Sequence, residues 1–133
     1  MAKDTKDTKT KKYSIEQFIN TESIISNSIS FDEKYVLYSC DKSGIYNAYI
    51  VSLEENRQQQ VTYSTTNAVH AISFFPNDYR FLYLSDQGGN EILHIYVQND
   101  NGESIDLTPD GTARAEFYHW SKDQKSFYYG SNK

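Results

Sequence analysis

The stretch from Ala71 to Thr108, AISFFPNDYRFLYLSDQGGNEILHIYVQNDNGESIDLT, contains a pattern that the sequence repeats on both sides of it. The pattern is a short β-rich run, a polar turn and a second β-rich run. Three segments of equal length carry it: ISFDEKYVLY at 29–38, FFPNDYRFLY at 74–83 and WSKDQKSFYY at 120–129. Their first residues lie 45 and 46 residues apart. A nearly constant period of this length predicts a repeat fold.

Turn signals divide each full copy further. A four-residue turn that starts with Asp and ends with Gly comes first, and this composition favours a type I turn. A β-rich run and a closing pair that ends in Thr follow; the three elements occupy 41–44, 46–51 and 61–62 in one copy and 86–89, 92–97 and 107–108 in the next. Asn101-Gly102 is a strong hairpin signal inside the second copy. Each full copy therefore predicts four short strands joined by tight turns.

A four-stranded antiparallel unit with this period is typical of a β-propeller blade. One twisted sheet exposes two faces, and it can cover them only by packing between neighbours. We therefore predict an all-β fold, a partial β-propeller of two four-stranded blades plus half of a third, preceded by a short N-terminal helix. An irregular β-sandwich is the alternative, because its turn signals recur at a similar spacing.

Changes in composition divide the chain into five parts. The expected parts are a disordered polar tail at 1–12, a short helix and lead-in at 13–27, a first blade at 28–66, a second blade at 67–112 and an incomplete third blade at 113–133. The tail has nothing apolar to bury in a core. In the helix, Ser14 and Gln17 make a capping box, and Ile15, Phe18 and Ile19 fall on one face.

The repeat alignment also predicts an incomplete ring. Asn132 takes the place of Asp41 and Asp86, so the sequence stops one residue into the turn of the third copy. Propellers contain roughly four to eight blades, and this chain cannot close such a ring. We therefore expect a piece of a longer protein. We also expect self-association through the open sheet edge near residues 127–129.

Charge and composition exclude several functions. The formal net charge is -5, and because residues 1–12 hold five Lys against two Asp, the remainder carries 8 basic and 16 acidic residues. An acidic body without a basic stripe argues against nucleic-acid binding. The single cysteine, Cys40, excludes an internal disulfide framework and fits a reducing compartment. Without a long apolar run or a secretory signal, we expect a soluble cytoplasmic protein with no membrane partner.

Residues that could carry chemistry are few. His70, His94 and His119 occupy unrelated places in the repeat, so we interpret them as structural. Zinc, phosphate and dinucleotide motifs are missing from the sequence. The nearest approach to a G-x-S-x-G nucleophile motif is Gly130-Ser131, which lacks the second glycine.

The remaining polar residues of note have structural explanations. Asp32, Asp78 and Asp123 fall in turns, so we interpret them as turn formers and not as a paired acid and base. Trp120 takes a strand position that is apolar in the other copies, which indicates packing. We predict no catalytic, cofactor-binding or metal-binding residues in this chain, and no cofactor.

The repeat segments resemble a known blade motif. ISFDEKYVLYS, FFPNDYRFLYLS and WSKDQKSFYYGS are similar to the motif shared by TolB-like propellers and the propellers of prolyl oligopeptidase family serine peptidases. Three longer stretches resemble the N-terminal propeller of family members of the acylaminoacyl or dipeptidyl type: YSIEQFINTESI, SDQGGNEILHIYV and DLTPDGTARAEFYHWSKDQKSFYYGSNK. The resemblance covers residues 13–133 and departs from the motif at Phe31 and Lys122, where proline is usual.

This resemblance implies a parent enzyme and not an active chain. In the family, the propeller precedes an α/β-hydrolase domain that supplies the Ser, Asp and His triad, and the propeller gates access for short peptides. We therefore expect a non-catalytic propeller fragment whose partners are the missing hydrolase domain and the peptide substrate of the parent. One alternative is a TolB-like interaction module without an enzymatic domain. Another is a small β protein that pairs its open edge with a second copy.

Overall fold

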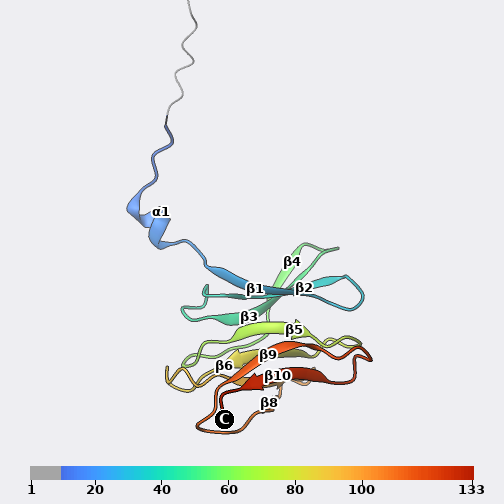
Figure 1. Ribbon diagram of the computed structural model, residues 1–133. Helices are drawn as coiled ribbons and strands as arrows, with labels where there is room; N and C mark the ends of the chain where they lie inside the picture. The colour runs from blue at the N-terminus through green and yellow to red at the C-terminus, as the bar shows by residue number, and fades with distance from the viewer. Residues whose placement is uncertain (1–9) are drawn as a thin grey trace, which may run out of the picture.

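The computed structural model describes residues 10–133 and shows three antiparallel sheets stacked on one another (Figure 1). Blade 1 consists of β1 (Ile24–Ile29), β2 (Tyr35–Cys40), β3 (Asn47–Ser52) and β4 (Arg57–Gln60). Blade 2 consists of β5 (His70–Phe74), β6 (Phe81–Ser85), β7 (His94–Gln98) and β8 (Ser104–Asp106). Blade 3 is the hairpin of β9 (Ala115–Trp120) and β10 (Phe127–Ser131). The predicted all-β partial propeller is confirmed; most of the expected tail lies outside the described residues.

Blade 1 begins earlier than the expected boundary at residue 28. Its first strand starts at Ile24, which pairs with Cys40. A β-bulge interrupts the β1–β2 ladder between Ile25 and Ser28, and Ser26 takes a left-handed conformation with φ 60°. The bulge breaks the alternation of polar and apolar residues, which is why the pattern did not indicate a strand there.

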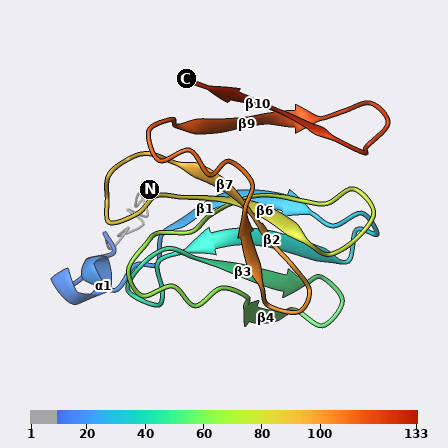
Figure 2. The ribbon, with the colours of Figure 1, turned by 90° about the horizontal axis from the view of Figure 1, so that it is seen from below.

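Two apolar seams hold the three blades together. Seam 1/2 joins buried side chains of blade 1 to those of blade 2; it contains Leu37, Ala48, Val69, Ala71, Phe74, Phe81 and Tyr83. Seam 2/3 contains Leu82, Ile95, Val97 and Ala115, with Phe117, Trp120 and Phe127 packed against them. Strand β6 alternates between the seams because successive side chains of a strand point to opposite faces. Blade 2 therefore buries both of its faces. In Figure 2 the β9–β10 hairpin lies at one side of the molecule with β7 next to it, and β3 and β4 lie at the opposite side.

Serine hydroxyls add polar contacts across both seams. Ser39 Oγ accepts a hydrogen bond from the backbone N–H of Ala71 at 2.7 Å, and Ser28 Oγ accepts one from Phe74 at 3.0 Å. In seam 2/3, the indole Nε1 of Trp120 donates to Ser73 Oγ at 2.9 Å. These directional bonds fix how far one blade can slide along the next.

The turns follow the sequence signals with one correction. The turn at 41–44 forms, because the Gly44 amide donates to the Asp41 carbonyl at 2.8 Å. The next turn was expected to be type I over 86–89, but the Asn90 amide donates to Gln87 O at 3.4 Å, so the turn starts one residue later. Its two central residues, Gly88 and Gly89, both have positive φ, as in type I′ turns.

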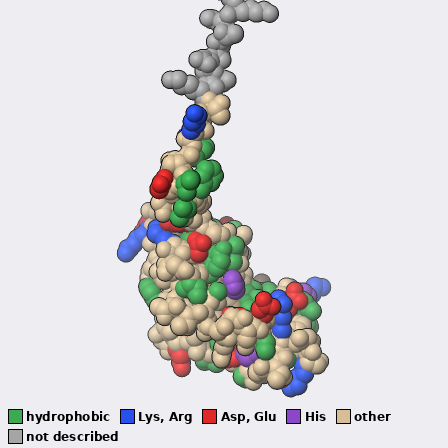
Figure 3. Space-filling model, turned by 90° about the vertical axis from the view of Figure 1, so that its left-hand side faces the viewer, with side chains coloured by type: hydrophobic (Ala, Val, Ile, Leu, Met, Phe, Trp, Pro, Cys, Tyr) green, Lys and Arg blue, Asp and Glu red, His purple; other side chains and the backbone are tan. Residues whose placement is uncertain are grey.

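The N-terminal arm stands apart from the blades. Helix α1 (Ile15–Ile19) has the predicted capping box, in which the Gln17 amide donates to Ser14 Oγ and the Ser14 amide donates to Gln17 Oε1. None of its residues is buried, and hydrophobic side chains are visible along the arm in Figure 3. Because the helix is short and buries no residue against the blades, only the segment between α1 and β1 determines where it lies.

Candidate functional site

An open cleft of about 540 Å³ lies where turns of blades 1 and 2 meet the starts of β5 and β9. Residues of all three blades line it, and the apolar part of its wall consists of Ile45, Ala68 and Leu93. Its titratable side chains are His70, Asp86, Glu91 and Arg114. The cleft is the best candidate for a binding site because it combines both signs of charge with an apolar wall.

His70 is the half-buried member of this group. It lies in β5 with its ring 5.6 Å from the ring of Tyr46, measured between centroids. Burial lowers the pKa of the His70 imidazole, while the nearby Asp86 carboxylate acts in the opposite direction. The ring is therefore neutral at pH 7 and can both donate and accept one hydrogen bond.

Backbone hydrogen bonds position the segments that carry the charged residues of the cleft. The Glu91 amide donates to Asp86 Oδ2 at 2.9 Å, which shapes the β6–β7 turn. In blade 3, the Arg114 amide donates to Asn132 Oδ1 at 2.7 Å. Carboxylates and a guanidinium can bind polar or zwitterionic ligands. Thr66 adds a hydroxyl to the lining, so the cleft combines charged, hydroxyl and apolar groups of the kind found in binding sites.

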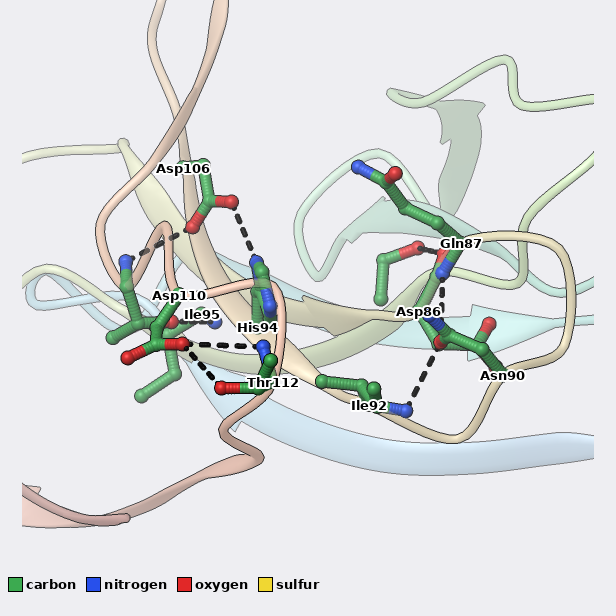
Figure 4. A network of polar contacts seen from close by, with 11 residues as sticks. Asp86, Gln87, Asn90, Ile92, His94, Ile95, Asp106, Asp110 and Thr112 are labelled. Atoms are coloured by element: carbon green, nitrogen blue, oxygen red, sulfur yellow. Dashed lines mark hydrogen bonds and ion pairs between the residues drawn. The ribbon is translucent and has the colours of Figure 1, made fainter. Parts of the chain in front are cut away.

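A histidine–carboxylate pair lies deeper in blade 2 (Figure 4). His94 Nδ1 is 2.7 Å from Asp106 Oδ2, and the His94 residue is only 8% exposed. The other oxygen of Asp106 accepts the Thr108 amide at 2.9 Å, and Thr108 Oγ1 accepts the Ile95 amide at 3.0 Å. Such a pair could orient a general base, but only if a nucleophile lay within reach.

Blade 1 contains a similar arrangement with an asparagine in place of the histidine. Asn47 takes the place of His94 at the start of the third strand, and its Oδ1 accepts the Thr62 hydroxyl at 2.9 Å and the Ser64 amide at 2.8 Å. Thr62 Oγ1 in turn accepts the Ala48 amide at 2.8 Å, as Thr108 does in blade 2. The role shared by Asn47 and His94 is to tie the third strand to the segment that leaves the fourth, which supports a structural role for His94.

The other predicted residues are dispersed. His119 is exposed on β9, with Nδ1 2.9 Å from the Trp120 carbonyl oxygen, and Ser131 Oγ at the end of β10 accepts the Lys133 amide at 3.3 Å. Thus the three histidines lie in β5, β7 and β9 without converging. Within residues 10–133, no group of three or more His, Cys, Asp and Glu side chains could hold a metal ion.

The aspartates lie in turns between the first two strands of each blade. Each accepts the backbone amide two residues later; the pairs are Asp32 with Lys34 (3.3 Å), Asp78 with Arg80 (2.9 Å) and Asp123 with Lys125 (3.2 Å). Asp78 also forms an ion pair with the Arg80 guanidinium at 2.8 Å.

Cys40 is fully buried in β2. No helix of the described part is long and apolar enough to cross a membrane.

Sequence reasoning missed the cleft and the His94–Asp106 pair. Asp86 was recognised only as a turn residue, and Glu91 and Arg114 carried no motif. The threonines were a partial signal: the repeat places Thr62 opposite Thr108, and their hydroxyls accept the amides of Ala48 and Ile95. The same spacing sets Asn47 opposite Leu93, so the match of Asn47 with His94 emerges only from the strand pairing.

Comparison with known proteins agrees with the repeat motifs. No family model matches the chain. The chain is 32% identical over 83 residues to dipeptidyl aminopeptidase BIII from Pseudoxanthomonas mexicana, which covers 61% of this chain and 12% of that protein. The crystal structure of TolB from Acinetobacter baumannii superposes with a TM-score of 0.69 at 20% identity, over 84% of this chain and 27% of that one.

These comparisons confirm the predicted resemblance at two levels. The TolB match shows the fold, and the dipeptidyl aminopeptidase match shows similarity in sequence. The chain spans about an eighth of the length of that peptidase. It is a TolB-like partial β-propeller whose sequence resembles a dipeptidyl aminopeptidase of the prolyl oligopeptidase family.

Proposed function

We propose that this chain is the non-catalytic propeller part of a prolyl oligopeptidase family serine peptidase, whose complete form hydrolyses short peptides. The observation that carries the proposal is the 32% identity over 83 residues with a dipeptidyl aminopeptidase. The propeller fold supports it, because the blade motifs resemble those that precede the hydrolase domain in this family.

The chemistry of the described residues supports a non-catalytic role. A serine peptidase needs a nucleophile, a base within hydrogen-bond reach and donors for the oxyanion. Among residues 10–133, no hydrogen bond joins a serine or cysteine side chain to a histidine ring. In this proposal, catalysis belongs to a separate hydrolase domain.

The stacked blades suit the role of a cap. Blade 2 buries both faces, and side chains of all three blades are interlocked at the two seams. A rigid cap over an active site would exclude water and limit the size of the peptide that enters. In the proposed peptidase, the propeller thus gates access while the hydrolase domain cleaves.

The proposal is tested first at the level of the gene. The coding sequence downstream of Lys133 should continue in frame and encode a G-x-S-x-G motif after further blades. Further blades followed by a stop codon, with no such motif, would overturn the peptidase assignment and indicate an interaction module.

A second test uses the purified 133-residue chain. Incubation with a serine-directed fluorophosphonate probe should give no covalent adduct in intact-mass spectra, because the described serines have no paired base. An active serine peptidase treated in parallel is the positive control. An adduct on any serine of this chain would contradict its non-catalytic role.

A further inference from the structure

A second open cleft, of about 450 Å³, lies between blades 1 and 2 at the other end of their strands, and we call it the inter-blade cleft. Strand β6 begins with Phe81, which lines the inter-blade cleft, and it ends just before Asp86, which lines the candidate site. Blade 1 contributes β3, β4 and the segment after β4, while blade 2 contributes β6, the end of β7 and two turns. Both walls are complete within residues 10–133, so the inter-blade cleft does not arise from the exposed outer face of blade 1 or blade 3.

Gln98 is a buried residue of this cleft with an unused hydrogen-bond donor. The residue is only 8% exposed, and its Oε1 accepts the Ser104 hydroxyl at 2.5 Å. No hydrogen bond among residues 10–133 uses its Nε2. The same residues include no fully enclosed side-chain nitrogen or oxygen without a hydrogen bond, so this nitrogen reaches solvent, and Gln98 lines the inter-blade cleft. A buried donor of this kind favours a ligand that brings a hydrogen-bond acceptor.

Two tyrosine rings are held at this cleft by their hydroxyl groups. The Tyr63 hydroxyl donates to the Gln60 carbonyl oxygen at 2.9 Å, and the Tyr79 hydroxyl donates to Asp32 Oδ2 at 2.6 Å. Tyr63 is 73% exposed and Tyr79 is 41% exposed, and both line the cleft. Because each hydroxyl proton is already used, the two residues offer a ligand mainly their aromatic rings.

We propose that the inter-blade cleft binds a proline-rich segment of another protein in the polyproline II conformation. Such a segment makes no internal hydrogen bonds and its prolines lack an N–H group, so its carbonyl oxygens are unpaired acceptors. Grooves lined by aromatic residues bind segments of this kind. Gln98 Nε2 would donate to one carbonyl oxygen, and the rings of Tyr63 and Tyr79 would contact the proline rings. The one charged side chain in the lining is Asp100, so the cleft suits an uncharged segment and repels an anionic one.

An oligosaccharide is the main competing ligand, because sugars also pack on aromatic rings. Sugar hydroxyls donate as well as accept, but the acceptor atom of Gln98 is already bonded to Ser104. A ligand that presents only carbonyl oxygens therefore matches the free group of Gln98 better. The inference does not depend on the proposed peptidase, because it concerns binding by the described blades and no step of hydrolysis.

Fluorescence anisotropy with a fluorescein-labelled decaproline peptide and the 133-residue chain tests the proposal. The wild-type chain should bind the peptide saturably. Gln98→Met removes the donor but keeps the length of the side chain, and it should weaken binding by about fivefold or more. The control Gln58→Met should bind like wild type, because Gln58 lies on the opposite face of blade 1, where its Nε2 donates to the Tyr38 hydroxyl. No saturable binding by the wild-type chain at millimolar peptide, or equal weakening in both variants, would overturn the proposal.

A second pair of variants tests the aromatic wall and does not disturb a buried residue. Tyr63→Ala should weaken binding by about fivefold or more, whereas Tyr63→Phe keeps the ring and should bind like wild type. Equal binding by Tyr63→Ala and wild type would contradict a role for the ring. Far-UV circular dichroism and Trp120 fluorescence confirm that each variant is folded before its binding is measured.

Two further ligands distinguish the proposed partner from others. A labelled glycine–serine peptide of the same length has carbonyl groups but no polyproline II preference, and it should not bind. Maltotriose, used as an unlabelled competitor, should not displace the decaproline peptide. Equal binding of the glycine–serine peptide, or displacement by maltotriose at a lower concentration than unlabelled decaproline requires, would overturn the assignment to a proline-rich segment.

Discussion

At the scale of single residues, the contact between Tyr79 and Asp32 joins two blades and depends on pH. The Tyr79 hydroxyl donates to Asp32 Oδ2 at 2.6 Å, and the Tyr79 ring packs 5.1 Å from Phe31. The hydrogen bond from Tyr79 lowers the pKa of Asp32, and the same bond raises the pKa of Tyr79 to about 12. The contact therefore requires an ionised carboxylate and a neutral phenol.

The sign of each shift sets the pH window of this contact. Because the folded-state pKa of Asp32 is lowered, its stabilisation is present above the ordinary value of 3.8 and is lost as the pH falls through the lowered pKa. Because the pKa of Tyr79 is raised, its stabilisation is present below 10.0 and is lost as the pH rises through about 12. A double-mutant cycle with Asp32→Asn and Tyr79→Phe, measured by urea unfolding, should give a favourable coupling at neutral pH that disappears in acid. A coupling of equal size at neutral and strongly acidic pH would be inconsistent with this contact.

At the scale of elements, the two seams should respond differently to the same truncation. Leu82 and Leu37 are both 0% exposed, but Leu82 lies in seam 2/3 and Leu37 in seam 1/2. Leu→Ala at either position should lower the free energy of unfolding by about 2–5 kcal/mol. The single tryptophan, Trp120, packs in seam 2/3 and reports on the docking of blade 3.

In Leu82→Ala, the fluorescence transition should therefore precede the loss of the far-UV circular dichroism signal during urea unfolding. In the matched variant Leu37→Ala, fluorescence should not change before circular dichroism, because seam 2/3 is intact. If both signals shift together and equally in the two variants, the three blades unfold as one cooperative unit and the seams are not separable.

The elements were predictable where a local pattern specified them. The β-rich run FLYLS, the Asn101-Gly102 hairpin and the Ser14–Gln17 capping box are each specified within a few residues, and each forms as predicted. The start of β1 at Ile24 was missed because a bulge breaks the alternation. The turn at Gln87 was misjudged because two successive glycines permit positive φ, which outweighs the preference that Asp86 expresses.

At the scale of the whole molecule, net charge should govern contact between copies. The formal net charge is -5 and the isoelectric point is near 5.1. Copies therefore repel one another at pH 8, and the repulsion vanishes near pH 5. Any association of copies through the open sheet edge near residues 127–129 should strengthen over this change in pH, as measured by sedimentation velocity. Association of equal strength at pH 8 and pH 5 would contradict a role for net charge.

The residues that line the candidate cleft could not be predicted from the sequence. Its titratable residues come from a strand start, a turn and the entry to a later blade, and they meet only because three blades stack. The repeat period predicted the stacking, and it placed Thr62 opposite Thr108. His70 and Arg114 are far apart in the sequence, and neither belongs to a motif. That both line one cleft was therefore not predictable.

The serine contacts across the seams have a consequence for how such a fold can gain or lose blades. An apolar surface alone would accept a new neighbour in several registers, whereas Ser28, Ser39 and Ser73 each require a donor at one position of the next blade. A duplicated blade inserted between existing ones would keep its alignment only if the hydroxyl were present, because the donors of Ala71 and Phe74 are backbone amides that any blade supplies. The register between neighbouring blades thus depends on a few small polar side chains, and exchange of blades between related proteins should succeed or fail at those positions.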